Sequence, residues 1–408
     1  MRVGIDGACW INRRGYGRFA RELVTSLVAL GGDVEYSLIA DFDPAQAPPV
    51  PAGVRVVPVN VHRPAARAAA ASGRRSLADL WTMSRAISRE RFDLVFFPTA
   101  YTYVPVTGPS RVVVVVHDII AERFPRQIFP TRRAAALWHL KLLAARWQAD
   151  LIMTVSEASR QGISSRFGIP RQRMAVVSEA ADPVFKRVPH DAKMQDVLQR
   201  LGLRQSKFLL YVGGISPHKN IAALVNAFAE LRRDGSYADY KLVLVGDYRG
   251  DVFYSAYDEL RRQSEALGLG EAIVFAGYVE DADLVYVYNA AEVFILPSLW
   301  EGFGLPVVEA MACGTPVVVS GCGALPEIVG SAGLLFDPQR PEELHALLRR
   351  VLGDADLRAQ LRHRGLQRAA EFSWERAARD TLAAFRRVAG RTRGRIVTTP
   401  PEEEVIPS

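Results

Sequence analysis

The sequence contains few cysteines and no long apolar segment. Its three cysteines, Cys9, Cys313 and Cys322, are an odd number without regular spacing, which argues against a disulfide framework and against a zinc site. A reducing compartment is the simpler interpretation, and we expect a cytoplasmic protein. No apolar run approaches the roughly 18 residues that a membrane-spanning helix needs. The first residues enter a strand-like run without the charged and apolar segments of a signal peptide. We therefore expect a soluble protein that contacts a membrane at most peripherally.

The charge is distributed unevenly along the chain. The net charge is +7, but residues 1–182 hold 24 Lys and Arg against 15 Asp and Glu, a net charge of +9, and the remainder has a net charge of −2. A basic first half beside a nearly neutral second half indicates an anionic partner for the first half. Nucleic acid would satisfy the charge, yet the sequence contains no motif for base recognition, so we do not expect it as a partner.

Short apolar runs alternate with longer amphipathic segments, which is typical of open parallel sheets flanked by helices. The length of 408 residues fits two domains. In the first half we predict strands at 2–6, 34–39, 54–59, 93–97, 111–116, 150–154 and 174–177, and helices at 17–30, 76–89, 131–147 and 157–167. The run from Arg111 to His117 encloses only valines, as expected for a strand that is buried on both faces.

A second series of the same kind follows a less regular, more polar segment, 183–206, which we interpret as an interdomain linker. Its predicted strands are 208–212, 241–245, 273–275, 293–296, 316–319 and 333–336. The domains would then be 1–182 and 207–371. A helix near 372–388 carries Trp374, Leu382 and Phe385 at helical spacing. The remaining residues, 391–408, are polar and rich in Pro and Glu, so we expect them to be disordered.

Segment 297–314, PSLWEGFGLPVVEAMACG, contains the strongest pattern for ligand binding. Glu301 precedes a glycine-containing loop and a short helix predicted to begin at Pro306 and to end at Gly314. Free backbone amides in such a loop and helix start can hold phosphate, and glycines let the backbone approach a ligand closely. The loop residues that we expect to contact a ligand are Gly302, Phe303, Gly304 and Leu305.

Glu309 stands eight residues after Glu301, in what should be the first turn of that helix. A carboxylate there can accept hydrogen bonds from the two vicinal hydroxyls of a ribose. The alternative is that Glu309 only offsets the helix dipole.

These residues resemble the large family of retaining nucleotide-sugar glycosyltransferases known as glycosyltransferase family 4, or glycosyl transferases group 1. The family's hallmark is two glutamates separated by seven residues, as in Glu301 and Glu309. Three further segments carry the resemblance: YVGGISPHKN at 211–220, FAGYV at 275–279 and TVSE at 154–157. The resemblance covers about residues 1–390 and implies the α/β GT-B fold, in which two doubly wound Rossmann-like parallel-sheet domains face each other across a cleft.

The resemblance also implies which residues bind the donor. Lys219, between a Gly-Gly turn and the next helix, would act as a point charge on the diphosphate; the alternative is a surface lysine. The family usually has an arginine where this chain has Gly214, so His218 or Arg18 would supplement the charge. Tyr278 and Val279 match the family's donor-binding segment. Together with Lys219, the resemblance makes His117 and Glu301 the candidate catalytic residues.

Two further segments would face the donor from the first domain. His117 ends the polyvaline strand, and ligands of such sheets bind beyond the carboxyl ends of the strands; the resemblance implies contact with the donor sugar, and the alternative is a structural histidine. Gly15, Gly17 and Arg18 precede the first predicted helix. They start too far beyond the strand for a dinucleotide fingerprint. The resemblance places this loop against the diphosphate or the sugar, and an ordinary glycine-rich turn is the alternative.

Two Asp-x-Asp triplets, at 41–43 and 281–283, would suit a divalent metal on a diphosphate. The first is in a proline-containing loop, and the second resembles a helix N-cap and first turn. We therefore expect no metal and no required cofactor, which agrees with the family resemblance.

Residues 123–147 combine arginines with aromatic residues, including Arg132, Arg133, Trp138 and Trp147. A basic, aromatic amphipathic helix can lie on an anionic membrane. Packing against the sheet accounts for the aromatic residues equally well.

The sequence therefore predicts a retaining transferase that moves a hexosyl unit from a nucleotide sugar to a glycan or lipid-linked glycan acceptor. Similarity to cell-surface polysaccharide mannosyltransferases favours GDP-mannose as donor, with UDP-glucose or UDP-GlcNAc second. A nucleotide-sugar epimerase or phosphorylase of similar fold, or a non-catalytic module that binds nucleotide sugars, is the alternative.

Overall fold

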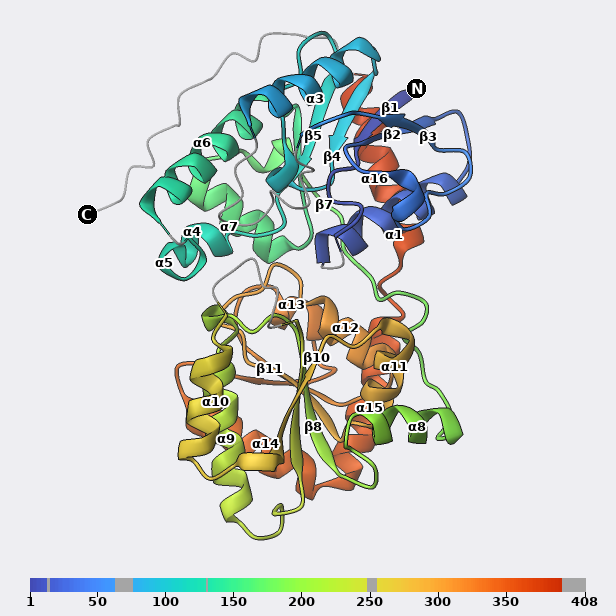
Figure 1. The fold of residues 1–408 in the computed structure, drawn as a ribbon. Coiled ribbons are helices and arrows are strands. Elements are labelled where there is room, and N and C mark those ends of the chain that lie inside the picture. The colour runs from blue at the N-terminus through green and yellow to red at the C-terminus, as the bar shows by residue number, and fades with distance from the viewer. Residues whose placement is uncertain (13–14, 63–75, 130, 248–254, 391–408) are drawn as a thin grey trace, which may run out of the picture.

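The computed structural model describes residues 1–12, 15–62, 76–129, 131–247 and 255–390. These residues form two domains, each with a parallel sheet between layers of helices (Figure 1). The tail predicted to be disordered, 391–408, lies outside the described residues.

The first domain contains a seven-stranded parallel sheet in the order β3-β2-β1-β4-β5-β6-β7. Each strand overlaps one that the sequence predicted. The strand order changes direction between β1 and β4, where doubly wound sheets bind their ligands. The strands are β1 (Arg2–Asp6), β2 (Glu35–Ala40), β3 (Arg55–Pro58), β4 (Leu94–Phe97), β5 (Arg111–Val115), β6 (Leu151–Thr154) and β7 (Met174–Val176).

Helices cover both faces of this sheet because alternate residues of each buried strand point to opposite faces. In β5, Val113 and Val115 join one apolar cluster, with residues of α1 and α16, while Val112 and Val114 join the other, with residues of α3, α6 and α7. The helices are α1 (Gly15–Ala29), α3 (Leu77–Arg89), α4 (Ile120–Arg123), α5 (Pro125–Ile128), α6 (Arg132–Gln148), α7 (Glu157–Phe167) and α16 (Trp374–Ala389).

The last of these helices returns from the second domain to the first, as the red ribbon in Figure 1 shows. The ring of Phe385 lies 5.1 Å from that of Phe96 in β4, and Trp374 lies 6.0 Å from Phe19 in α1. The chain therefore passes between the domains twice, once before α8 and once before α16.

The second domain contains a six-stranded parallel sheet in the order β10-β9-β8-β11-β12-β13. Its strands are β8 (Phe208–Val212), β9 (Lys241–Val245), β10 (Ile273–Gly277), β11 (Val293–Leu296), β12 (Val317–Ser320) and β13 (Leu334–Phe336). Its helices are α8 (Ala192–Arg200), α9 (Ile221–Arg233), α10 (Tyr257–Ala266), α11 (Asp281–Ala290), α12 (Leu305–Ala312), α13 (Leu325–Val329), α14 (Pro341–Gly353) and α15 (Ala355–Ala369). Short 3-10 turns occur at η1 (Pro44–Gln46), η2 (Ala100–Thr102), η3 (Arg171–Arg173), η4 (Pro217–Lys219) and η5 (Gly270–Ala272).

The segment predicted to be an irregular linker differs from that expectation, because α8 forms within it. Asp191 caps the helix by accepting a hydrogen bond of 3.0 Å from the backbone N–H of Met194. Met194, Val197 and Leu198 recur at helical spacing and are buried. This apolar stripe packs against α11, so residues 192–200 belong structurally to the second domain.

Candidate active site

A cavity of about 690 Å³ lies between the two domains. It is formed by loops that follow the carboxyl ends of strands in both sheets, which is where parallel α/β sheets bind ligands. Every residue that the sequence singled out for donor binding lines this cavity, apart from Gly17. These residues are Gly15, Arg18, His117, Gly214, His218, Lys219, Tyr278, Val279, Glu301, Gly302, Phe303, Gly304, Leu305 and Glu309.

Gly17 serves packing rather than the cavity wall. A Cβ atom at this position would lie 1.8 Å from the carbonyl oxygen of Asn12. Only glycine lets α1 lie this close to the preceding turn, and Gly17 is not among the residues that line the cavity.

Glu301 and Lys219 form a buried ion pair in the second domain. Lys219 Nζ donates to Glu301 Oε1 at 2.6 Å, and Ser298 Oγ donates to the same oxygen at 2.6 Å. Burial alone would raise the pKa of Glu301, but the charge and hydrogen bond of Lys219, together with Ser298, lower it overall. Glu301 is therefore ionised, and Lys219 is held at the cavity wall.

The glycine loop after Glu301 touches the first domain closely. A Cβ atom on Gly302 would lie 2.7 Å from the carbonyl oxygen of His117. The Gly302 carbonyl also accepts hydrogen bonds from Ser156 Oγ at 2.6 Å and Ser159 Oγ at 3.0 Å. Gly304 precedes α12 with φ +97°, a conformation that favours glycine. The sequence-predicted phosphate cradle thus sits at the domain interface.

Glu309 is almost fully enclosed, with 3% of its side chain exposed. Arg18 Nη1 donates to its Oε1, and Tyr288 Oη donates to its Oε2 at 2.9 Å. The sequence predicted Glu309 in the first turn of this helix. Because α12 begins at Leu305, Glu309 lies beyond the first turn. Burial raises the pKa of Glu309, and the charge of Arg18 opposes this rise.

His117 lies at the end of β5, on the first-domain side of the cavity. Its Nε2 is 2.9 Å from the carbonyl oxygen of Pro98, and its Nδ1 is 3.4 Å from Glu179 Oε1. Burial lowers the pKa of His117, but the hydrogen bond and charge of Glu179 outweigh it, so the pKa is raised overall. His117 therefore has a fixed ring orientation and an increased tendency to be protonated.

His218 lies at the cavity wall in an environment that disfavours its protonated form. It is buried and stacks at 6.4 Å on Phe124 of the first domain. Burial, with the neighbouring charge of Lys219, lowers the pKa of His218 to about 4. Without a bound anion the ring is therefore neutral near neutral pH, and the positive charge that the sequence predicted for His218 stays a prediction for the complex with a diphosphate.

The two Asp-x-Asp triplets use their carboxylates within the protein. Asp43 caps η1 through the backbone N–H of Ala45 at 3.0 Å. Glu280, not Asp281, is the N-cap residue of α11. Among the described residues, no group of three or more His, Cys, Asp or Glu side chains is arranged to hold a metal ion.

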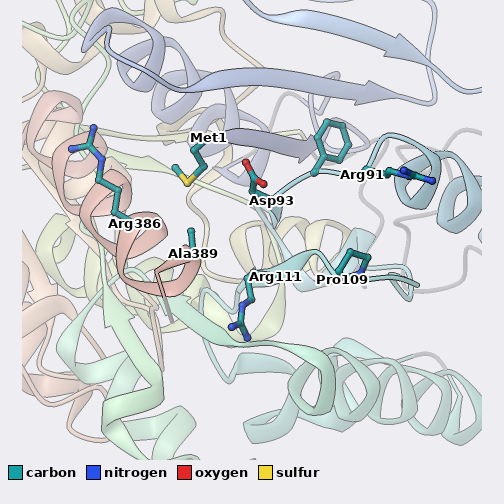
Figure 2. A pocket seen from close by; sticks show the side chains of 8 residues that line it. Met1, Arg91, Asp93, Pro109, Arg111, Arg386 and Ala389 are labelled. Carbon is teal, nitrogen blue, oxygen red and sulfur yellow. The ribbon is translucent and has the colours of Figure 1, made fainter. Parts of the chain in front are cut away.

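A second cavity, of about 490 Å³, lies at the amino ends of strands β1, β4 and β5 of the first sheet (Figure 2). Arginines surround it, but Arg111 pairs with Asp150 at 2.8 Å and Arg386 pairs with Asp33 at 3.1 Å. With two of its three arginines paired, this cavity is a weaker candidate than the interdomain one. Its lining residues are Met1, Arg91, Phe92, Asp93, Pro109, Arg111, Arg386 and Ala389.

Comparison with known families agrees with this geometry. The family profile described as "Glycosyltransferase Family 4" matches residues 13–185, and the one described as "Glycosyl transferases group 1" matches residues 195–368. Together the two profiles cover both domains. The chain belongs to this glycosyltransferase family.

Individual relatives agree with the assignment. O-antigen chain mannosyltransferase B of Escherichia coli is 38% identical over 242 residues, which are 58% of this chain and 61% of that protein. The serotype-specific mannosyltransferase WbdA of Escherichia coli is 30% identical over 304 residues, 71% of this chain and 36% of that protein. The matched region is thus less than two thirds of either relative's length.

A solved structure shows the same fold. Sucrose-phosphate synthase from Thermosynechococcus elongatus superposes with a TM-score of 0.72 at 19% identity, over 95% of this chain and 99% of that one. The GT-B fold predicted from the sequence is confirmed.

Three residues that the sequence did not single out hold the side chains of the predicted site in place. Glu179 orients His117, Ser298 holds Glu301, and Tyr288 holds Glu309. Glu179 carried a usable signal, because it follows the predicted strand at 174–177 as His117 follows its own strand. Tyr288 lies within a helix, where no local pattern marks a buried partner for a glutamate 21 residues later.

Proposed function

We propose that this protein transfers a hexosyl unit from a nucleoside-diphosphate sugar to a glycan or lipid-linked glycan, with retention of the anomeric configuration. The single observation that carries the proposal is the arrangement of Lys219, Glu301 and the loop 302–305 around one interdomain cavity. GDP-mannose is the first candidate donor, because relatives that match the chain are described as mannosyltransferases.

The chemistry follows from where charge develops. The bond between the sugar C1 and the diphosphate oxygen breaks through an oxocarbenium-like state, and a bond from the acceptor oxygen to C1 forms on the same face. The acceptor proton passes to the leaving phosphate oxygen. Lys219 and the amides of 302–305 stabilise the negative charge on the diphosphate, and fixed dipoles of this kind need no reorganisation during the reaction.

The remaining side chains orient the sugar. Glu301, ionised and held by Lys219, accepts hydrogen bonds from sugar hydroxyls. His117 contacts the sugar from the opposite wall, with its ring orientation set by Glu179. We propose that no divalent metal takes part, because a lysine and helix-start amides are available for the same electrostatic task.

We also propose that the acceptor is presented at an anionic membrane surface on the cytoplasmic side, where α6 would make peripheral contact. The outward face of α6 exposes Leu137, Leu140, Leu143 and Trp147 beside Arg132 and Arg133. Apolar side chains flanked by arginines suit the boundary between headgroups and acyl chains. None of the helices in the described part of the chain is long and apolar enough to cross a bilayer.

Slow hydrolysis of a donor panel without acceptor tests the proposed function. GDP-mannose, UDP-glucose and UDP-GlcNAc would be incubated with the wild type and with Glu301→Gln, with and without EDTA. We expect the wild type to hydrolyse GDP-mannose, the variant to be much slower, and EDTA to have little effect. Failure to cleave any nucleotide sugar would overturn the proposal, and activity that EDTA abolishes and Mn²⁺ restores would overturn its metal-free form.

A further inference from the structure

Arg18 links the two domains at the cavity wall. It projects from α1 of the first domain, and its Nη2 donates to both carboxylate oxygens of Asp281 in α11, at 2.6 and 2.5 Å. Its Nη1 donates to Glu309 of α12, and its guanidinium carbon lies 5.5 Å from the ring centroid of Phe185. One side chain is thus held by two helices of the second domain and by the segment that connects the domains.

These contacts and burial restrict the access of another partner to Glu309. Arg18 donates to one carboxylate oxygen and Tyr288 to the other, and the side chain is 3% exposed. A ribose whose hydroxyls donate to Glu309 needs a path to the remaining lone pairs of these oxygens. The guanidinium of Arg18 stands between Glu309 and the exposed part of the site, where Asp281 lies with 33% of its side chain exposed.

We propose that Arg18 is an interdomain latch that competes with the donor ribose for Glu309, and that Asp281 is the residue that holds this latch in place. The inference rests on the proposed function, in which Glu309 receives the ribose. Binding of the nucleotide requires Arg18 to leave Glu309 and Asp281 together, because the pair with Asp281 holds the guanidinium at Glu309. The ribose hydroxyls then replace the hydrogen bond that the buried carboxylate loses, which avoids an unpaired buried charge.

The competition has a measurable consequence for affinity. When only a fraction of molecules has the competent arrangement, the apparent dissociation constant equals the intrinsic one divided by that fraction. Weakening the hold of Asp281 raises the fraction with Glu309 accessible. Ligands with ribose hydroxyls gain from this change, and ligands without them do not, because they never contact Glu309.

The test compares ligands with and without the ribose hydroxyls in three variants of the 408-residue chain. The ligands are GDP and its analogue that lacks both ribose hydroxyls, and the corresponding uridine pair is run in parallel. Asp281→Asn weakens the latch. Asp283→Asn is the matched control, because Asp283 lies in the same first turn of α11 but pairs with Arg200 at 3.0 Å. Arg18→Lys is a second latch variant, which keeps the charge and loses the planar fork.

We expect the preference for the ribose-bearing ligand, the ratio of the two dissociation constants by calorimetry, to rise about fivefold or more in Asp281→Asn. Arg18→Lys should change the ratio in the same direction, and Asp283→Asn should leave it as in the wild type. A ratio that is unchanged or falls in both Asp281→Asn and Arg18→Lys would overturn the latch.

Glu309→Gln separates the latch from the proposed function. In this variant we expect the preference for ribose to disappear. If the preference persists, Glu309 is not the ribose acceptor and the latch is wrong, while hydrolysis of nucleotide sugars still decides the proposed function on its own. If the preference disappears in Glu309→Gln but rises in neither Asp281→Asn nor Arg18→Lys, the ribose contact stands and the latch is wrong.

Discussion

Lys219 lines the proposed diphosphate site, where it pairs with Glu301 at 2.6 Å. Gly214 occupies the position where the family usually has an arginine, and His218 is neutral because burial lowers its pKa to about 4. Arg18 is engaged by Glu309 and Asp281. We therefore expect the electrostatic stabilisation of the leaving group to depend strongly on Lys219.

Lys219→Ala should cost about 3 kcal/mol of transition-state stabilisation, a hundredfold or more in rate. Steady-state hydrolysis of the best donor is the measurement. Lys241→Ala is the control, since Lys241 Nζ binds the carbonyl of Gly202 and does not line the cavity. Thermal unfolding shows whether the variant is folded. Nearly full turnover in a folded Lys219→Ala would contradict the assignment.

Glu179→Gln should lower the pKa of His117. Burial lowers that pKa, and Glu179 raises it above the ordinary value of 6.5. Because the pKa of His117 is higher in the folded protein than in the unfolded chain, protonation of His117 stabilises the fold. This stabilisation is fully present below the unfolded pKa and is lost as the pH rises through the folded pKa.

Two measurements check this prediction. By NMR, the titration of His117 should move to lower pH in Glu179→Gln. In urea unfolding, the free-energy difference between wild type and variant should be largest at low pH and should shrink as the pH rises through the folded pKa. An unshifted His117 titration would show that Glu179 does not control the ring.

At the scale of single residues, the sequence predicted the residues that line the site better than the residues that hold them in place. Glu301, Lys219 and His117 follow strand ends or a glycine loop, so their shared edge could be anticipated. Tyr288 became visible only in the fold. Glu179 follows a predicted strand, but its pairing with His117 could not be predicted, because both pairings depend on tertiary packing. Gly17 shows the converse, since a backbone-packing glycine and a ligand-binding glycine look identical in sequence.

Among the elements, α6 exposes large apolar side chains on its outward face. Trp138 is partly buried, stacks on Tyr101 at 4.5 Å and donates to Glu122 at 2.7 Å, so it is unsuited to membrane insertion. Trp147 is 86% exposed. Of the two tryptophans that the sequence offered for membrane contact, the structure leaves Trp147 accessible.

Flotation with liposomes tests this face. We expect the protein to bind anionic vesicles and not neutral ones, and binding should weaken with salt, because the screening length is about 8 Å at physiological ionic strength. Arg132→Glu/Arg133→Glu should reduce binding, and Trp147→Ser should reduce the part that resists salt. Arg349→Glu/Arg350→Glu, an exposed arginine pair on α14, is the control. Absence of binding to either vesicle type would make α6 an ordinary solvated helix.

The strands were easier to predict than the segment around α8. A parallel strand buried on both faces is a continuous apolar run, as in β5 and β8, and a short run of valines or other large apolar residues between polar segments is typical of such a strand. In α8 the polar residues outnumber the three buried ones, Met194, Val197 and Leu198. Its helical spacing was present in the sequence, but the polar composition around it masked the signal.

At the scale of the whole molecule, contacts away from Arg18 also join the domains. The Glu327 carboxylate accepts hydrogen bonds from the backbone N–H groups of Glu157 and Ala158, both at 3.0 Å. These groups belong to the first turn of α7, where the helix dipole favours a negative charge. Glu327 therefore stabilises the closed arrangement of the two domains.

Glu327→Ala should enlarge the radius of gyration in the absence of nucleotide, because one of the contacts that favour closure is lost. A saturating nucleoside diphosphate should remove the difference from the wild type, since a ligand that contacts both domains shifts the population toward closure. Small-angle scattering is the measurement, with Glu342→Ala as control. Glu342 is exposed on α14 and pairs only locally, with Arg340. A radius of gyration that is the same in Glu327→Ala and the wild type would contradict the role of Glu327. A radius of gyration that nucleotide changes in neither protein would contradict ligand-dependent closure.

The most direct test of the central claim is NMR observation of the sugar that the wild type releases from GDP-mannose before its anomers equilibrate. If the cleft cleaves the donor and an incoming oxygen attacks the same face of the sugar, α-mannose is the first product. Glu301→Gln and Lys219→Ala should both reduce the rate of its release. Release of β-mannose first would contradict the retaining mechanism. Intact GDP-mannose after prolonged incubation, with the other nucleotide sugars also unconsumed, would contradict the proposal that this cleft transfers sugars.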